Sequence, residues 1–264
     1  MLYPKKSLGQ NFLRSKSALM KIIEAADLKP DDVVLEVGPG EGILTSALLE
    51  KAGKVIAVEK DDRLIPFLRQ KFSREIEIGK LTLIHEDILE FSIFNFQFSN
   101  YKLIANIPYY ITGALLKNFL QSDSQPSKMV LLLQKEVAKR IVQSAKGRLK
   151  ESILSISVKV YGEPRYVDTV KAECFSPQPK VDSAILSIEN ISKKFFTENN
   201  LNEEKFFSLV KTGFKSKRKI LIGNLGISKH PELEKILAEA GITRKTRAEE
   251  ISVSQWAKLA KALS

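Results

Sequence analysis

Residues 101–110 read YKLIANIPYY, and this stretch predicts a buried strand that runs into a rigid loop. Asn106 ends the apolar run, and Pro108 prevents further strand pairing because proline has a fixed φ and no N–H. In an open α/β sheet, a loop at the carboxyl end of a parallel strand lies where ligands bind. The Asn106 amide oxygen and a neighbouring backbone carbonyl are two acceptors, and Tyr109 offers a flat face for stacking. These groups suit the exocyclic amino group of a purine; an ordinary turn beside a core tyrosine has the same pattern.

A strand, a glycine-rich turn and a helix are predicted over residues 33–51. The turn, residues 38–42, reads GPGEG, and glycine is needed where the backbone approaches a ligand closely. Its spacing, G-x-G-x-G, is one residue shorter than the dinucleotide fingerprint. Glu36 and Glu41 flank the turn, and no basic side chain lies in it. A cationic cofactor such as S-adenosylmethionine therefore fits better than the pyrophosphate of NAD.

Polar residues also follow the next predicted strands. The strand at residues 54–58 ends at Glu59, whose carboxylate can accept hydrogen bonds from ribose hydroxyls. The strand at residues 81–84 is followed by Asp87, which can accept from an adenine amino group. Asn106 follows the fourth strand. This ordered series predicts a doubly wound α/β sheet with a cofactor site at the carboxyl ends of its strands.

Length and composition predict a soluble globular protein. The 264 residues, 44% of them hydrophobic, are enough for one large core and a small second domain. A single cysteine, Cys174, excludes an internal disulfide, and with only two histidines a zinc site is not expected. No signal peptide or membrane span is recognisable, so we expect a cytoplasmic protein.

The positive charge is concentrated near the C-terminus. Residues 191–264 carry 15 Lys/Arg and 8 Asp/Glu, which is +7 of the total formal charge of +11. This excess favours a polyanionic partner, and a basic protein without such a partner is the alternative. We expect a catalytic domain over residues 1–190, a linker over 191–201 and a basic, helical, RNA-binding domain over 202–264.

Several motifs together resemble the ribosomal RNA adenine N6,N6-dimethyltransferases, which modify two adjacent adenosines near the 3′ end of the small-subunit rRNA. In chain order they are GQNFL (9–13), EVGPG (36–40), Glu59, Glu86-Asp87, NIPYY (106–110), FSPQPKVDS (175–183), FKSKRK (214–219) and RAE (247–249). The resemblance implies a Rossmann-like class I methyltransferase sheet with a small all-helical C-terminal domain. It also implies a monomer that uses S-adenosylmethionine and no metal, acting on 16S rRNA in the assembling small subunit and not on a membrane.

The motifs and the resemblance together predict individual site residues. Those expected at the cofactor are Asn11, Leu13, Glu36, Gly38, Gly40, Glu59, Asp87, Ile88 and Asn106. Those expected around the target base are Asn106, Ile107, Pro108, Tyr109 and Phe175. Those expected to contact RNA are Lys5, Lys6, Lys146, Arg148, Lys217, Arg218 and Lys219.

A mechanism follows from the chemistry of the target. The N6 lone pair of adenine is delocalised into its ring, so the amine is a poor nucleophile. We expect the Asn106 side-chain oxygen and the Ile107 carbonyl to accept the two N6 hydrogens and aim the lone pair at the methyl group. Tyr109 would stack on the extruded base, and Phe175 would line its pocket.

Three other functions share parts of this pattern. A related enzyme dimethylates a large-subunit (23S) rRNA adenine and confers antibiotic resistance. A non-catalytic ribosome assembly factor could keep the same fold. An NAD-dependent oxidoreductase would share the strand–turn–helix unit, but the short glycine spacing opposes it.

Overall fold

The computed structural model describes the chain apart from residues 1–3, 6–7, 92–99, 143–149, 217 and 264. Two compact units are present, one formed by Met1–Ala138 with Glu163–Ile191 and the other by Lys139–Gly162 with Ser192–Ser264. The second unit thus includes residues 139–162, which were predicted to lie in the catalytic domain. The segment 191–201, predicted as a linker, contains helix α8 (Lys194–Asn199), because Phe196 on this helix is buried in an aromatic cluster.

A seven-stranded sheet forms the centre of the first unit, in the order β4-β3-β2-β5-β6-β9-β7. The strands are β2 (Val33–Val37), β3 (Lys54–Glu59), β4 (Leu81–His85), β5 (Lys102–Asn106), β6 (Lys128–Gln134), β7 (Glu163–Val170) and β9 (Ser183–Glu189). Strands β2 to β6 pair in parallel, and β9 is antiparallel to both of its neighbours. The order reverses between β2 and β5, and ligands bind outside the carboxyl ends of strands at such a point. The predicted doubly wound sheet is confirmed.

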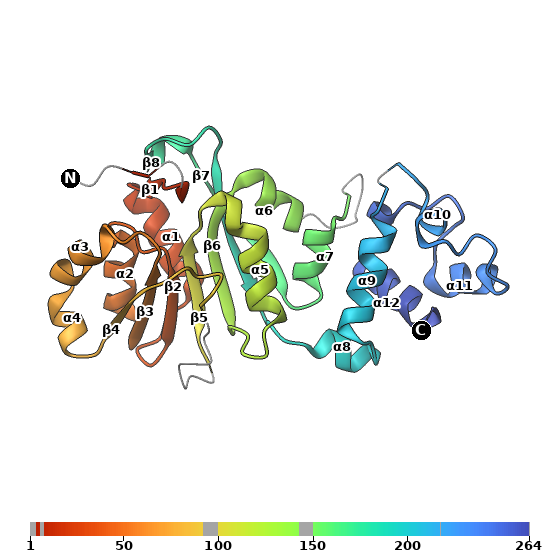
Figure 1. Ribbon diagram of the computed structural model, residues 1–264, viewed down its shortest axis with the longest axis horizontal. Coiled ribbons are helices and arrows are strands. Elements are labelled where there is room, and N and C mark those ends of the chain that lie inside the picture. The colour runs from red at the N-terminus through yellow and green to blue at the C-terminus, as the bar shows by residue number, and fades with distance from the viewer. Residues whose placement is uncertain (1–3, 6–7, 92–99, 143–149, 217, 264) are drawn as a thin grey trace. The chain divides into compact units, whose positions relative to one another are not determined.

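Helices cover both faces of this sheet, with α5 on one face and α1 and α2 on the other (Figure 1). The helical segments are α1 (Lys16–Ala26), α2 (Ile43–Lys51), α3 (Leu64–Lys71), α4 (Ser73–Glu77), η3 (Tyr109–Ile111), α5 (Thr112–Gln121), α6 (Lys135–Val142) and η4 (Ala172–Cys174). A separate antiparallel pair joins β1 (Phe12–Leu13) to β8 (Phe175–Ser176). This pair holds the N-terminal segment beside the proline-rich loop.

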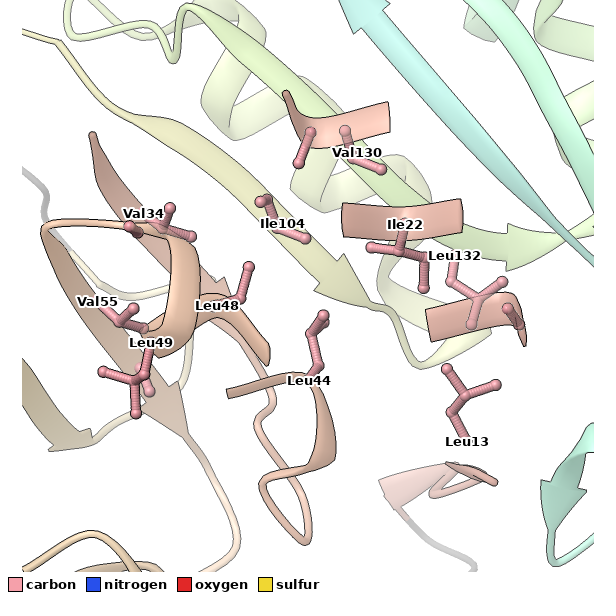
Figure 2. Close-up of a cluster of buried hydrophobic side chains, with 14 of the residues drawn as sticks. Leu13, Ile22, Val34, Leu44, Leu48, Leu49, Val55, Ile104, Val130 and Leu132 are labelled. Atoms are coloured by element: carbon pink, nitrogen blue, oxygen red, sulfur yellow. The ribbon is translucent and has the colours of Figure 1, made fainter. Parts of the chain in front are cut away.

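The apolar faces of α1 and α2 form a core with the middle of the sheet. Ile22 of α1 and Leu48 of α2 are both almost completely buried. Figure 2 shows them among Val34, Ile104 and Val130, which belong to β2, β5 and β6. Each fully buried aliphatic side chain stabilises a fold by about 1.5–3 kcal/mol. The core therefore holds the carboxyl ends of β2 and β5 side by side.

The second unit is helical, as predicted for the C-terminal part. Besides α8 it contains α7 (Ile153–Lys159), α9 (Glu203–Gly213), α10 (Leu221–Leu225), α11 (Leu233–Ala240), η5 (Ala248–Glu250) and α12 (Val253–Ala262). Trp256 of α12 is fully buried and packs closely on α9, where a Cβ on Gly213 would lie 2.4 Å from the indole ring. None of the helices in the described ranges is both long and apolar enough to cross a membrane.

The turn between α2 and β3 requires a glycine. A Cβ on Gly53 would lie 2.4 Å from the Pro30 carbonyl oxygen, whereas a Cβ on Gly113 in α5 would meet nothing within 4 Å. We expect Gly53→Ala to lower the free energy of unfolding by about 1–3 kcal/mol. The control Gly113→Ala should raise it by about 0.5–1 kcal/mol, because alanine loses less backbone entropy in a helix. Urea unfolding measures both, and equal effects would contradict the steric argument.

Candidate functional site

A pocket lies at the carboxyl ends of β2, β3, β4 and β5. It is open to solvent on one side, and the empty space within it and its mouth together is about 930 Å³. Three parts of the chain line this pocket. They are the N-terminal segment, the residues that follow β2, β3 and β4, and the NIPYY loop. The lining residues are Leu8, Gly9, Gln10, Asn11, Phe12, Val37, Gly38, Gly40, Val58, Glu59, Lys60, Glu86, Asp87, Ile88, Leu89, Asn106, Ile107, Pro108, Tyr109, Tyr110 and Ile111.

Most of the predicted site residues meet in this pocket. Those from the cofactor set that line it are Asn11, Gly38, Gly40, Glu59, Asp87, Ile88 and Asn106, and those from the target set are Asn106, Ile107, Pro108 and Tyr109. Leu13, Glu36 and Phe175 are not among its lining residues. Leu13 and Phe175 lie opposite each other on β1 and β8, where both belong to the hydrophobic core. For these three residues a direct contact with a ligand remains a prediction.

The Asn106 amide is oriented by the N-terminal segment. Its Nδ2 donates a hydrogen bond to the Asn11 carbonyl, with a distance of 3.0 Å. Because a backbone carbonyl only accepts, this contact commits the amide nitrogen and leaves Oδ1 as an acceptor at the pocket. The Asn11 side chain in turn donates to the Gly9 carbonyl at 3.1 Å. Next to Asn106, the Ile107 N–H donates to the Leu132 carbonyl of β6 at 3.0 Å, which fixes the start of the loop.

The two tyrosines of the loop have different surroundings. The Tyr109 hydroxyl lies 2.8 Å from the hydroxyl of Ser183, which is completely buried at the start of β9. Burial raises the pKa of Tyr109, so the phenol stays neutral at physiological pH. Tyr110 is 61% exposed at the pocket, and its ring lies 3.4 Å from the position of a Cβ on Gly9. One aromatic ring is therefore anchored, and the other is presented to solvent.

Glu59 joins the glycine turn to the end of β3. Its two carboxylate oxygens accept hydrogen bonds from the Gly40 N–H at 3.1 Å and the Asp61 N–H at 2.8 Å. Burial raises the pKa of Glu59, whereas the hydrogen bonds from these amides lower it, and the net shift is upward. Each oxygen keeps a second lone pair, which is what a ribose hydroxyl requires.

The glycine turn leaves space for a ligand. Gly38 has a φ of +68°, and a Cβ there would meet no protein atom within 4 Å. A Cβ on Gly40 would instead lie 2.9 Å from the Phe12 ring. The open side of Gly38 together with the carboxylates of Glu59 and Asp87 fits a bound nucleoside that carries positive charge.

Asp87 is engaged by two groups. Its Oδ2 lies 2.5 Å from the Lys60 ammonium, and its Oδ1 accepts from the Leu89 N–H at 3.0 Å. Partial burial raises the pKa of Asp87, whereas Lys60 and the Leu89 amide lower it, and the net shift is downward. The ionised carboxylate is therefore a permanent acceptor at the end of β4.

Glu36 lies beneath the pocket rather than in its wall. Successive side chains of a strand point to opposite faces, so Val37 lines the pocket and Glu36 does not. Both Glu36 carboxylate oxygens and the Thr45 hydroxyl are buried and make no hydrogen bond of ordinary geometry among the described residues, although Thr45 lies close enough to Glu36 to lower its pKa. Burial raises the pKa of Glu36 to about 8, and the nearby charge of Glu59 acts in the same direction.

Four of the lining residues that were not predicted as site residues shape the pocket: Gln10, Phe12, Lys60 and Tyr110. Gln10 donates to the Asp61 carboxylate at 2.8 Å and so ties the N-terminal segment to the end of β3. Gln10 and Phe12 belong to the GQNFL motif and Tyr110 belongs to NIPYY, and this membership is the one sequence feature that pointed to them. Nothing in the charged run after Glu59 distinguishes Lys60 from its neighbours.

The predicted RNA-contacting residues are only partly described. Lys5, Arg218 and Lys219 are exposed, whereas Lys6, Lys146, Arg148 and Lys217 lie outside the described residues. The turn before Arg218 is held by the Asn224 amide, which donates to the carbonyls of Gly213 and Ser216. Across the described residues, no three His, Cys, Asp or Glu side chains are grouped as a metal site.

The buried Glu36 predicts a pH dependence of stability. Its folded-state pKa of about 8 lies above its ordinary value of 4.5, so its contribution is fully present below 4.5 and is lost as the pH rises through 8. At about 1.4 kcal/mol per unit, the loss is at most about 5 kcal/mol. Glu36→Gln should therefore match the wild type near pH 5 and be about 1–5 kcal/mol more stable near pH 8.5 in urea unfolding. Glu77→Gln, at an exposed site, is the control; an equal gain at both pH values would contradict the assignment.

Comparisons with known proteins agree with this geometry. Residues 1–264 match the family described as ribosomal RNA adenine dimethylase. The chain is 45% identical to a ribosomal RNA small subunit methyltransferase A from Dehalococcoides mccartyi, over 98% of this chain and 88% of the relative. It is 38% identical to the protein of the same name from Fusobacterium nucleatum, over 97% and 96%.

Two solved structures share the fold over nearly the whole chain. The 23S rRNA methyltransferase ErmE is 28% identical, with a TM-score of 0.76 over 96% of this chain and 99% of that one. A dimethyladenosine transferase from Plasmodium falciparum is 26% identical, with a TM-score of 0.77 over 96% and 97%. With a whole-chain family match, close relatives and a pocket that unites the predicted motifs, the chain belongs to the ribosomal RNA adenine dimethylase family.

Proposed function

We propose that this protein transfers methyl groups from S-adenosylmethionine to N6 of two adjacent adenosines in a loop near the 3′ end of 16S rRNA. It acts on a precursor of the small ribosomal subunit, in the cytoplasm, as a monomer and without a metal. The orientation of the Asn106 amide carries this proposal, because an amide oxygen is presented beside a pocket suited to a cationic nucleoside.

The strand ends would hold the cofactor. Glu59 would accept from the ribose hydroxyls and Asp87 from the adenine amino group, while Ile88 provides an apolar contact for the ring. Gly38 would permit close approach of the backbone. S-adenosylmethionine, when bound, supplies a methyl group activated by its sulfonium. The carboxylates of Glu59 and Asp87 at the pocket favour that positive charge.

The NIPYY loop would hold the target base. The Asn106 Oδ1 and the Ile107 carbonyl would accept the two N6 hydrogens and draw the nitrogen toward tetrahedral geometry. Pro108 limits the movement of the loop because its φ is fixed. Tyr109, anchored on Ser183, would stack on the extruded base, and Phe175 would support that wall of the pocket from the core. No strong general base is required, because the amine becomes more acidic as it gains a methyl group.

The names of the relatives favour the small subunit over the large one. The proteins named small subunit methyltransferase A are 45% and 38% identical to this chain, whereas the 23S enzyme ErmE is 28% identical. Isotopically labelled cofactor with either subunit from a strain that lacks the modification would separate the two substrates. Dimethyladenosine found by mass spectrometry in 23S rRNA alone would contradict the proposal, and no turnover on either would favour a non-catalytic assembly factor.

Asn106→Ala tests the acceptor role. Removing the amide oxygen should lower kcat by about 10²–10³-fold, as for other groups that stabilise developing charge. The affinity for S-adenosylhomocysteine, measured by calorimetry, should change by no more than a few fold. Asn199→Ala is the control, since its amide donates to the Phe195 carbonyl at 2.8 Å in the second unit and does not line the pocket. A wild-type rate for Asn106→Ala would refute the mechanism.

Arg218 and Lys219 test the RNA-binding role of the second unit. The double variant Arg218→Ala/Lys219→Ala should weaken binding to unmethylated small subunits and reduce the slope of log K against log salt by about 1–2, one step for each phosphate that is no longer neutralised. Lys229→Ala/Lys235→Ala removes the same charge from exposed positions near α11. If both double variants reduce the slope equally, the effect is one of total charge and not of this site.

A further inference from the structure

Lys60 occupies a position that the proposed function does not explain. It directly follows Glu59, lines the pocket and holds Asp87 Oδ2 at 2.5 Å. Among the described lining residues it is the only cation, beside the acidic Glu59, Glu86 and Asp87. A cation in a pocket for a positively charged cofactor opposes binding unless it moves.

Lys60 lies at the Asp87 oxygen that the backbone does not engage. Asp87 Oδ1 is already engaged by the Leu89 N–H, and Oδ2 by the Lys60 ammonium. An adenine amino group that approaches Oδ2 from the pocket therefore competes with the Lys60 ammonium for the same oxygen. The Lys60 side chain is 53% exposed, so its ion pair is of the weak, solvent-screened kind that a ligand can displace.

The released ammonium would remain in the pocket beside the NIPYY loop, which is proposed to hold the target base. Lys60 and the exposed Tyr110 of the NIPYY loop line the same pocket. Once displaced from Asp87, the ammonium lies in a mostly acidic pocket, and the anion that arrives there is a phosphate next to the target adenosine. Phosphate contacts by lysine are the usual source of RNA affinity.

We propose that the adenine amino group of the cofactor displaces Lys60 from Asp87, and that the freed Lys60 then binds an RNA phosphate. Lys60 is thus a positioning residue that makes RNA binding depend on a loaded cofactor site. By thermodynamic linkage, RNA must strengthen cofactor binding by the same factor. The inference rests on the proposed function.

The test measures binding rather than turnover, with S-adenosylhomocysteine, which cannot donate a methyl group. Calorimetry gives its affinity for the free protein, and filter binding gives the affinity for unmethylated small subunits with and without it. The wild type should bind subunits about 5–10-fold more tightly with S-adenosylhomocysteine. Lys60→Met should bind it at least as tightly as the wild type but show less than about twofold coupling. Lys60→Arg should restore the coupling, and Lys51→Met, at an exposed site on α2, should not change it.

Three results would overturn the inference. Lys60→Met could retain wild-type coupling, it could lose affinity for S-adenosylhomocysteine, or it could weaken subunit binding equally with and without that ligand. The proposed function fails differently, if the wild type with S-adenosylmethionine places no methyl group on 16S rRNA. A wild type that methylates 16S rRNA but shows no coupling overturns the role of Lys60 alone.

Discussion

The hydrogen bond from the Asn106 amide to the Asn11 carbonyl is the contact on which the site depends. It joins residues 95 positions apart and decides which end of the amide faces the pocket. Two features support it: the pairing of β1 with β8, which holds the N-terminal segment, and the core under β5, which holds the strand end. A change in either feature would move an acceptor that must be placed to within a fraction of an ångström.

Acidic side chains lie at two depths around this contact. Glu59 and Asp87 line the pocket and are satisfied by backbone amides, whereas Glu36 lies below it without a hydrogen bond of ordinary geometry among the described residues. A buried carboxyl without hydrogen bonds destabilises the folded state when it ionises. With a pKa of about 8, Glu36 is mostly neutral at physiological pH, so the negative potential at the pocket comes from Glu59 and Asp87. The positive charge of Lys60, paired with Asp87, weakens the negative potential of the pocket.

The order of strands, helices and polar strand ends could be predicted from local patterns. The apolar runs ending at Glu59, Asp87 and Asn106 are short and bounded by polar residues, so each signals a buried parallel strand. Residues 191–201 lack a clear periodic pattern, and their polar composition concealed helix α8. Phe196 stabilises that helix by packing against Phe206 and Phe207, which lie ten and eleven positions further along the chain in another helix, α9.

The sequence by itself determined the α/β class, the acidic character of the cofactor region and the presence of an acceptor loop, because these depend on residue types within a few positions of one another. The tertiary structure alone decided that Glu36 faces the core, that Leu13 and Phe175 pair beside the pocket, and that Lys60 reaches Asp87. The reason is physical. Local periodicity fixes which side chains share a face of a strand, but only packing over the whole sheet fixes which faces and strand ends meet.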